Sequence, residues 1–188
     1  MSISSSWIHG NALTIESPIM FEFNYNTEKM EEIGRFVLTP SGPGTWVDAE
    51  RGGEVSWFHL PIPTINANVS PVKRYELLRV FLLFWCEHAH IREVHVYDGS
   101  DKIQEFKVAS LQGNYLVQLK KNTFHFGMEP HQVKSGISIS FLFAANYAED
   151  LPHRRLFVAA AGADFLTSST LFSKAISARD HIISRLTR

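Results

Sequence analysis

A long apolar run, followed by an alternating segment and a turn, constrains the fold of this chain more than any other feature. The apolar run spans Leu77–Cys86, and the alternating segment spans Ile91–Tyr97. The turn is Asp98-Gly99-Ser100-Asp101, after which alternation resumes through Ile103 and Phe106. Period-two alternation on both sides of an Asp-Gly pair predicts an antiparallel β-hairpin. We therefore expect an all-β fold.

Further strands are expected wherever residues alternate or form apolar runs rich in β-branched and aromatic side chains. The expected strands cover residues 7–16, 18–24, 33–39, 54–62, 77–86, 91–98, 102–109, 114–121, 136–144 and 154–161. Residues 40–44 read as a loop, and residues 87–90 as a turn between two strands. Regular spacing of turns, without alternation of strands and helices, favours an antiparallel β-sandwich that is jelly-roll-like.

Two of these strands indicate how the layers pack. One face of residues 136–144 is strongly apolar and needs a second sheet to cover it, with Ile137, Ile139, Phe141 and Phe143 on that face. Both faces of residues 54–60 carry large side chains, with Val55, Trp57 and His59 opposite Ser56, Phe58 and Leu60. Such a strand is either central in the sheet or buried against another subunit. Together with an apolar stripe at helical spacing in the last residues of the chain, it favours a homo-oligomer.

The last residues of the chain change to a helical period. Apolar side chains recur at helical spacing among Leu171, Phe172, Ala175, Ile176, Ile182, Ile183 and Leu186. We expect a β-sandwich domain over residues 1–165 and an amphipathic helical extension over residues 166–188, capped by Thr167, Ser168 or Ser169. The helix would pack on its own sandwich or dock on a partner, and in the second case the protein would be a scaffold.

Composition narrows the class of protein. The chain has 188 residues, of which 45% are hydrophobic, and a formal net charge of -1. This composition suits a single globular domain and argues against partners that are nucleic acids or anionic membranes. The longest apolar run is too short to span a membrane, and the N-terminus has no secretory pattern, so we expect a cytoplasmic protein. The single cysteine, Cys86, reads as a buried and inert thiol.

Five segments resemble a family of uncharacterised, mostly bacterial proteins that share a domain of unknown function. The segments are Trp7-Ile8-His9-Gly10-Asn11, Gly42-Pro43-Gly44-Thr45-Trp46, Trp57-Phe58-His59-Leu60-Pro61-Ile62-Pro63-Thr64, Val94-His95-Val96-Tyr97-Asp98-Gly99 and Ala159-Ala160-Ala161-Gly162-Ala163-Asp164-Phe165. The resemblance covers residues 7–165 and implies a compact antiparallel β-sandwich. It implies no reaction, ligand or catalytic residue, and the tail after Phe165 departs from the pattern.

One cluster has the composition of a metal site. His88, His90 and Glu93 combine imidazole and carboxylate groups, which suit Zn, Fe, Ni or Mn. The cluster is similar to the metal signature of cupins, but the upstream glycine and the downstream half are absent and the acid lies one residue too close. An alternative function is therefore a cupin-like metal-dependent enzyme that draws on His9, His59, His88, His90 and His95. The simpler interpretation is that polar residues gather at a turn.

Aromatic residues offer a different kind of site. Indole and phenol faces stack on the apolar side of sugar rings, so Trp7, Trp46, Trp57 and Tyr97 are candidates for a binding platform. We expect Trp46 to be the most exposed of them, and core packing is the competing role for each. The candidate ligand-binding residues are Trp46, Tyr97, His95, Asp98, His9 and His59.

No specific catalytic motif stands in the chain. A G-x-S-x-G elbow, a phosphate-binding P-loop and a D-x-D-x-D calcium loop are all absent. The sequence thus predicts a non-catalytic binding or assembly module without a cofactor, which recognises a carbohydrate or another small polar ligand. The metal-dependent enzyme, with a transition-metal ion, and the scaffold that pairs through its C-terminal helix are the alternatives.

Overall fold

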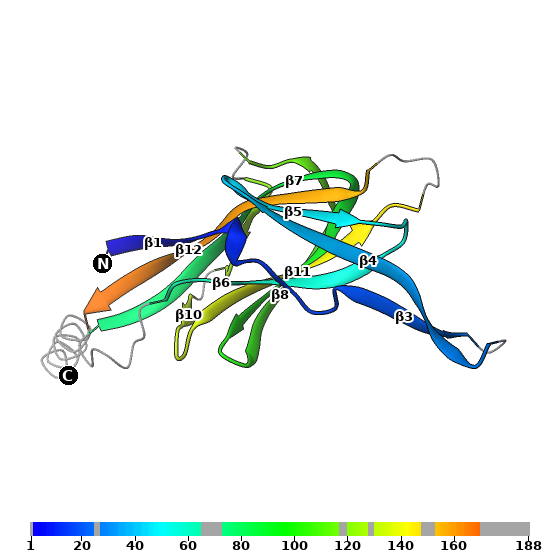
Figure 1. Cartoon of the computed structure of the whole chain (residues 1–188). Helices are drawn as coiled ribbons and strands as arrows, with labels where there is room; N and C mark the ends of the chain where they lie inside the picture. Colours follow the sequence, from blue (N-terminus) through cyan, green and yellow to red (C-terminus); the bar gives the residue numbers. More distant parts are fainter. Residues whose placement is uncertain are drawn as a thin grey trace, which may run out of the picture.

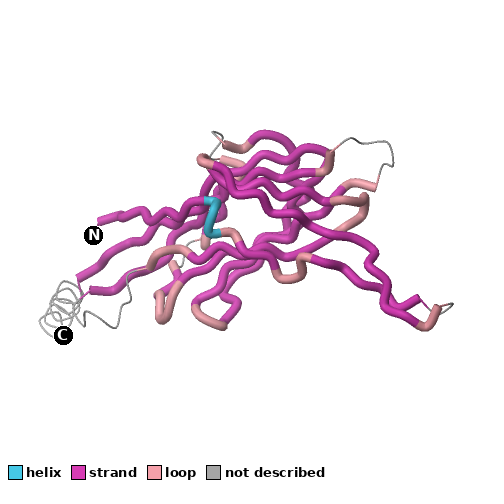
Figure 2. The backbone as a smooth tube through the Cα atoms, in the orientation of Figure 1, coloured by secondary structure: helices cyan, strands magenta, loops and turns pink. Residues whose placement is uncertain are grey.

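A computed structural model describes residues 2–24, 27–64, 73–116, 120–127, 130–147 and 153–169. The described residues form antiparallel strands and one short helical turn, η1 (Gly10–Ala12) (Figure 2). The strands are β1 (Ser2–His9), β2 (Thr14–Ile15), β3 (Ile19–Asn24), β4 (Lys29–Ser41), β5 (Gly44–Ala49), β6 (Val55–Pro61), β7 (Lys73–Asp98), β8 (Asp101–Asn114), β9 (Thr123–His125), β10 (His131–Gln132), β11 (Ile137–Ala145) and β12 (Arg155–Ser169). The predicted antiparallel all-β class is confirmed. Within the described segments, no helix is long and apolar enough to cross a membrane.

Strand β7 organises the sheet. Its first part pairs with β12, its second part pairs with β11, and its other edge receives β10, β9 and β8. The main strand order is β2-β6-β11-β7-β12-β5-β4-β3. Figure 1 shows that this sheet curls, so that the β6–β11 side and the β4–β5 side face one another. The two layers expected from the sequence are thus halves of one curled sheet.

The expected turn at residues 87–90 is wrong, because β7 is continuous through it. Glu87 pairs with β12 and Ala89 pairs with β11, so the strand changes partner across His88. His88 has a φ of 51°, and the register with β8 shifts between Cys86 and Ile91. An irregularity of this kind bends a strand without ending it. The polar residues that resembled a turn therefore mark a corner of the sheet.

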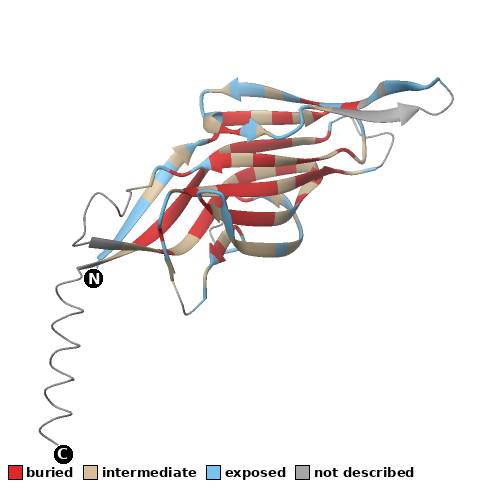
Figure 3. Ribbon diagram, turned by 90° about the horizontal axis from the view of Figure 1, so that it is seen from below, coloured by how far each residue is buried: buried red, intermediate tan, exposed pale blue. Residues whose placement is uncertain are grey.

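The core lies between the two halves of the curled sheet. Phe36 of β4 meets Phe58 of β6 and Phe143 of β11 edge to face, with ring centroids 5.7 and 5.8 Å apart. These contacts join strands that lie far apart in the strand order. Buried residues alternate along the strands (Figure 3), and the predicted apolar face of residues 136–144 is confirmed as core. Its members Ile137, Ile139, Phe141 and Phe143 are all buried.

The hairpin predicted around Asp98 and Gly99 is confirmed. Asp98 pairs with Asp101 at the end of the β7–β8 ladder, and Gly99 and Ser100 form the turn. Gly99 has a φ of 64°, the backbone conformation that a type II′ turn requires at its first central residue. The same ladder places Cys86 in the core, where burial raises the pKa of its thiol and keeps it protonated, as expected for an inert cysteine.

Several strand boundaries differ from the expectation. Residues 40–44 were expected to be a loop, but Pro40 belongs to β4 and pairs with Thr45 of β5. Strand β5 itself was not predicted. Proline is tolerated there because β3 pairs β4 only as far as Arg35, which leaves that edge open among the described strands. Residues 114–121 were expected to be a strand, but β8 ends at Asn114 and residues 120–122 form a turn. In the N-terminal strand expected over residues 7–16, η1 separates β1 from β2.

At the C-terminus, β12 continues to Ser169 and pairs with β7 throughout its length. Residues 166–169 therefore extend the sheet instead of opening a helix. The remainder of the helical extension expected over residues 166–188 lies outside the described residues. The division at residue 165 and the docking role of the tail stay predictions.

Candidate functional site

The outer face of β6, β11 and β7 carries a row of polar side chains in cross-strand register. His59 of β6 lies opposite Ser140 of β11, and Ser140 lies opposite His95 of β7. The row continues to Glu105 of β8. Because the neighbouring residues Phe58, Phe141, Val94 and Val96 point into the core, strand alternation directs this row away from it.

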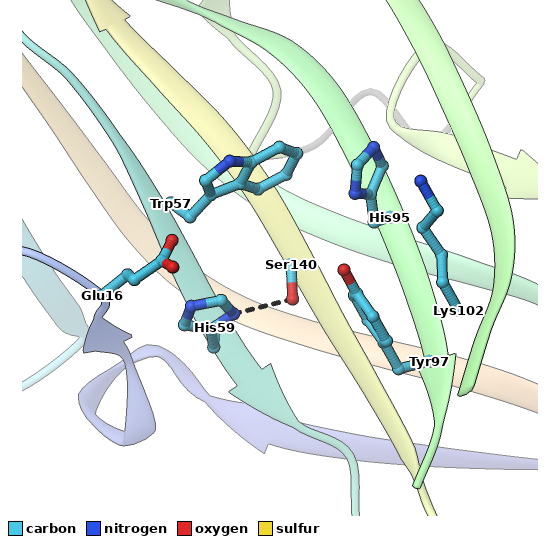
Figure 4. A pocket seen from close by; sticks show the side chains of 7 residues that line it. All are labelled: Glu16, Trp57, His59, His95, Tyr97, Lys102 and Ser140. Carbon is cyan, nitrogen blue, oxygen red and sulfur yellow. Dashed lines mark hydrogen bonds between the residues drawn. The ribbon is translucent and has the colours of Figure 1, made fainter. Parts of the chain in front are cut away.

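A hollow of about 240 Å³ opens over this row (Figure 4). Its lining consists of Glu16, Trp57, His59, His95, Tyr97, Lys102 and Ser140. Ser140 is 3% exposed and lies at the centre of the group, where it forms the floor. Two aromatic rings, an imidazole pair and a hydroxyl thus surround one small space.

Two contacts hold the imidazole groups in place. Nδ1 of His59 lies 2.7 Å from Oγ of Ser140, within hydrogen-bond distance. Within the described part of the chain, Nε2 of His59 has no hydrogen-bond partner and remains free for a ligand. The ring of His95 packs against Trp57, with centroids 4.4 Å apart and planes 36° from parallel. These contacts preorganise the hollow.

Charged groups gather on the β8 side of the hollow. Nε2 of His95 lies 3.2 Å from Glu93 and 3.5 Å from Glu105. Nζ of Lys102 lies 2.8 Å from Glu105. This hydrogen bond lowers the pKa of Glu105 and raises the pKa of Lys102, so both groups are charged at neutral pH. The cluster presents fixed hydrogen-bonding groups to a ligand.

A β-bulge directs two consecutive charged residues outward. Ile91 and Val94 are both fully buried, so Arg92 and Glu93 between them both lie on the outer side of β7. The ladder with β11 shifts register at this point, where Leu142 pairs with Glu93 and Phe143 pairs with Ile91. Bulges re-aim side chains in this way, often beside functional sites. In the sequence, the apolar residues Ile91 and Val94 are three positions apart, although residues on one face of a regular strand are two apart. This spacing indicates the bulge.

Among the described residues, one set of three side chains has ligand atoms close enough together to hold a metal ion. These are Glu93, His95 and Glu105, whose ligand atoms all lie within 4.8 Å of one another. Imidazole and carboxylate ligands suit Zn or Mn, although the amine of Lys102 already neutralises Glu105. The structure therefore brings Glu93 to His95 instead of to the predicted partners. His88 lies at the corner of β7, and Nδ1 of His90 lies 3.0 Å from Oδ1 of Asn146.

Three of the six candidate ligand-binding residues lie in the hollow, namely His59, His95 and Tyr97. The other three lie elsewhere. Trp46 packs against Trp85 and Phe157, and the guanidinium of Arg155 covers its ring at 4.9 Å. Asp98 is buried below the hairpin turn, and Nδ1 of His9 accepts a hydrogen bond from the backbone N–H of Asn11.

Sequence reasoning did not select Ser140, Glu16 or Lys102. The alternation in residues 136–144 had placed Ser140 on the face opposite the core, which is a usable signal once a neighbour such as His59 is known. Glu16 follows the two-residue strand β2, and Lys102 follows the hairpin turn, so neither has a local pattern that marks it.

No family model matches this chain, and no curated protein matches it. Among solved structures, it is similar to a low-affinity xylan-binding module, CBM86, from the gut symbiont Roseburia intestinalis, with a TM-score of 0.41, 9% identity and coverage of 87% of this chain and 96% of that chain. It is also similar to TmCBM61 in complex with β-1,4-galactotriose, with a TM-score of 0.29, 13% identity and coverage of 87% and 88%. At these TM-scores, the likeness assigns no ligand and no site to this chain.

Proposed function

We propose that this protein is a non-catalytic binding module, and that the hollow over Ser140 holds a carbohydrate or another small polyhydroxylated ligand. The observation that carries the proposal is the convergence of Trp57, Tyr97 and His59 with Ser140 in one preorganised space. Aromatic rings cover the apolar face of a sugar, while imidazole and hydroxyl groups bond its hydroxyls. A space of about 240 Å³ suits one small ring.

The surroundings of Ser140 favour binding over hydrolysis. Its hydroxyl lies beside His59, a geometry that could activate a nucleophile. Acyl transfer, however, also needs N–H donors aimed at the oxyanion. At this position β11 is paired with β6 on one side and with β7 on the other, so the backbone N–H groups around Ser140 are directed at the neighbouring strands and not at a bound substrate. The contact between Ser140 and His59 therefore orients the imidazole of His59, and Ser140 does not attack a substrate.

Substitution of Trp57 tests the proposal. We expect Trp57→Ala to weaken the binding of a ligand found in a broad panel of soluble neutral and acidic sugars by at least about tenfold, because one stacking ring is lost. Calorimetric titration measures the affinity, and thermal unfolding checks that the variant is folded. The matched control is Trp46→Ala, which removes an indole outside the hollow and should leave the affinity unchanged. A panel without any ligand for the wild-type protein would reject the proposal.

Self-association is a further part of the proposal. Strand β1 pairs only with β12 among the described strands, and it presents Ile3 and Trp7 at 63% and 45% exposure. An open edge with apolar side chains favours pairing with a second copy. We expect light scattering at micromolar concentration to show a dimer or larger species, which Ile3→Lys should shift toward the monomer. A strict wild-type monomer would contradict this.

The remaining expectations stay predictions. They are a cytoplasmic location, the lack of nucleic-acid and membrane partners, a metal-dependent activity as the alternative function, and a scaffold role for the tail. The jelly-roll arrangement also stays a prediction beyond the antiparallel curled sheet that the described residues form.

A further inference from the structure

A second hollow, of about 430 Å³, lies on the same outer face as the first. The small side chains of Ala144 and Ala145 line it, together with Val55. Three polar or aromatic side chains also line it, namely those of His90, Arg92 and Tyr147. None of the residues that line this second hollow also lines the first.

The two hollows follow one another along the strands. Val55 lies opposite Ala144, and Ala144 lies opposite His90, which forms a row parallel to the row of His59, Ser140 and His95. Val55 and His59 are four residues apart on one strand face, so the two rows are about 13 Å apart at roughly 3.3 Å per residue. Trp57 stands between them on β6, and Glu93 stands between them on β7. The two hollows therefore lie next to each other on one continuous face of the sheet.

The chemistry of the second hollow differs from that of the first. Arg92 is exposed, and the residues that the structure describes supply it with no acidic partner. The ring of Tyr147 is 82% exposed and rests over Gly53, where a Cβ would collide with it. His90 is held by Asn146 at 3.0 Å. An unneutralised guanidinium beside an imidazole and an exposed phenol ring favours a carboxylate carried on a sugar ring.

We propose that the two hollows are successive subsites for one extended ligand, an acidic oligosaccharide whose carboxylate meets Arg92. The bulge in β7 makes this arrangement possible, because it turns Arg92 toward the second hollow, while Glu93 contacts His95, a residue that lines the first hollow. The inference rests on the proposed function, since the first hollow must bind a sugar ring for the second to extend it.

Chain length and charge are the variables of the test. Calorimetric titrations use mannuronate oligomers and neutral mannose oligomers, both β-1,4-linked and matched from disaccharide to hexasaccharide. For the wild type, affinity should rise about tenfold or more from the disaccharide to the longer chains, and more steeply for the acidic series. Arg92→Ala should remove the preference for the acidic series, whereas Arg92→Lys should retain part of it. Tyr147→Ala should weaken only the longer chains, and the exposed Lys134→Ala serves as the charge control.

The outcomes separate the two proposals. If the wild type binds none of the oligomers and no sugar in the broader panel, the proposed function fails, and this inference falls with it. If the disaccharide binds through Trp57 but affinity stays flat with length, only the two-subsite inference is overturned. Equal affinity for acidic and neutral chains, or unchanged charge preference in Arg92→Ala, overturns the role of the carboxylate. A gain with length that disappears in Tyr147→Ala supports the inference.

Discussion

Replacing Phe58 with alanine is expected to lower the free energy of unfolding by about 3–5 kcal/mol, the usual range for a buried phenylalanine. Phe58 is fully buried, stacks on Phe141 at 5.6 Å and meets Phe36 and Phe143 edge to face. These rings belong to the two halves of the curled sheet. The cavity left by the substitution would lie where the halves meet and could not be filled by a local shift alone.

Urea unfolding followed by tryptophan fluorescence measures this loss. Phe58→Leu is the conservative control and should recover more than half of the stability, because it refills most of the volume. Val37→Thr, at an exposed site of β4, should change the free energy of unfolding by less than about 0.5 kcal/mol. A loss below about 1 kcal/mol for Phe58→Ala would show that the two halves do not depend on this contact.

Replacing Asp98 with asparagine should lower stability at neutral pH by about 1–3 kcal/mol, the range for buried groups left without their partners. The carboxylate of Asp98 accepts hydrogen bonds from the backbone N–H groups of Lys134, Ser135 and Gly136, and it lies 2.9 Å from Nε2 of His131. An asparagine side chain has one acceptor oxygen and turns an amide donor toward these donors. The segment before β11 would lose its anchor.

The same residue predicts how stability changes with pH. Burial by itself would raise the pKa of Asp98, but the hydrogen bonds from His131 and from residues 134–136 outweigh it, and the pKa lies below its ordinary value. A folded-state pKa below the unfolded one contributes stability above the unfolded pKa, near 3.9, and this contribution is lost as the pH falls through the folded pKa. The wild type should therefore lose stability in acid more steeply than Asp98→Asn.

Denaturant unfolding at a series of pH values between neutral and acid checks both statements. Asp101→Asn is the matched control, because Asp101 is the exposed aspartate on the other side of the same turn. It should leave stability at neutral pH and the acid dependence nearly unchanged. Parallel pH curves for the wild type and Asp98→Asn would contradict the role assigned to the buried carboxylate.

Local signals in the chain predicted the fold class and much of the strand pattern, because alternation and turn residues act over a few neighbouring residues. The β7–β8 hairpin followed from alternation around Asp98 and Gly99. The core face of β11 followed from its apolar alternation, whereas both faces of residues 54–60 carry large side chains, so the outward direction of Trp57 and His59 was not predicted. Tyr97 was a candidate because a phenol ring can stack on a sugar, and His95 was a candidate ligand-binding residue beside it.

Only the tertiary structure decided which of these residues meet. His59 and His95 lie on different strands, and the register of both strands against β11 brings them to the two sides of Ser140. Register and strand order depend on how the whole apolar surface is buried, which no short segment encodes. The same cause moved Trp46 into the cluster around Arg155 and turned the expected break at His88 into a bend of one strand. The sequence by itself determined the alternation of side chains along the regular strands, and the closure of the sheet determined which face of each strand is buried and which side chains become neighbours.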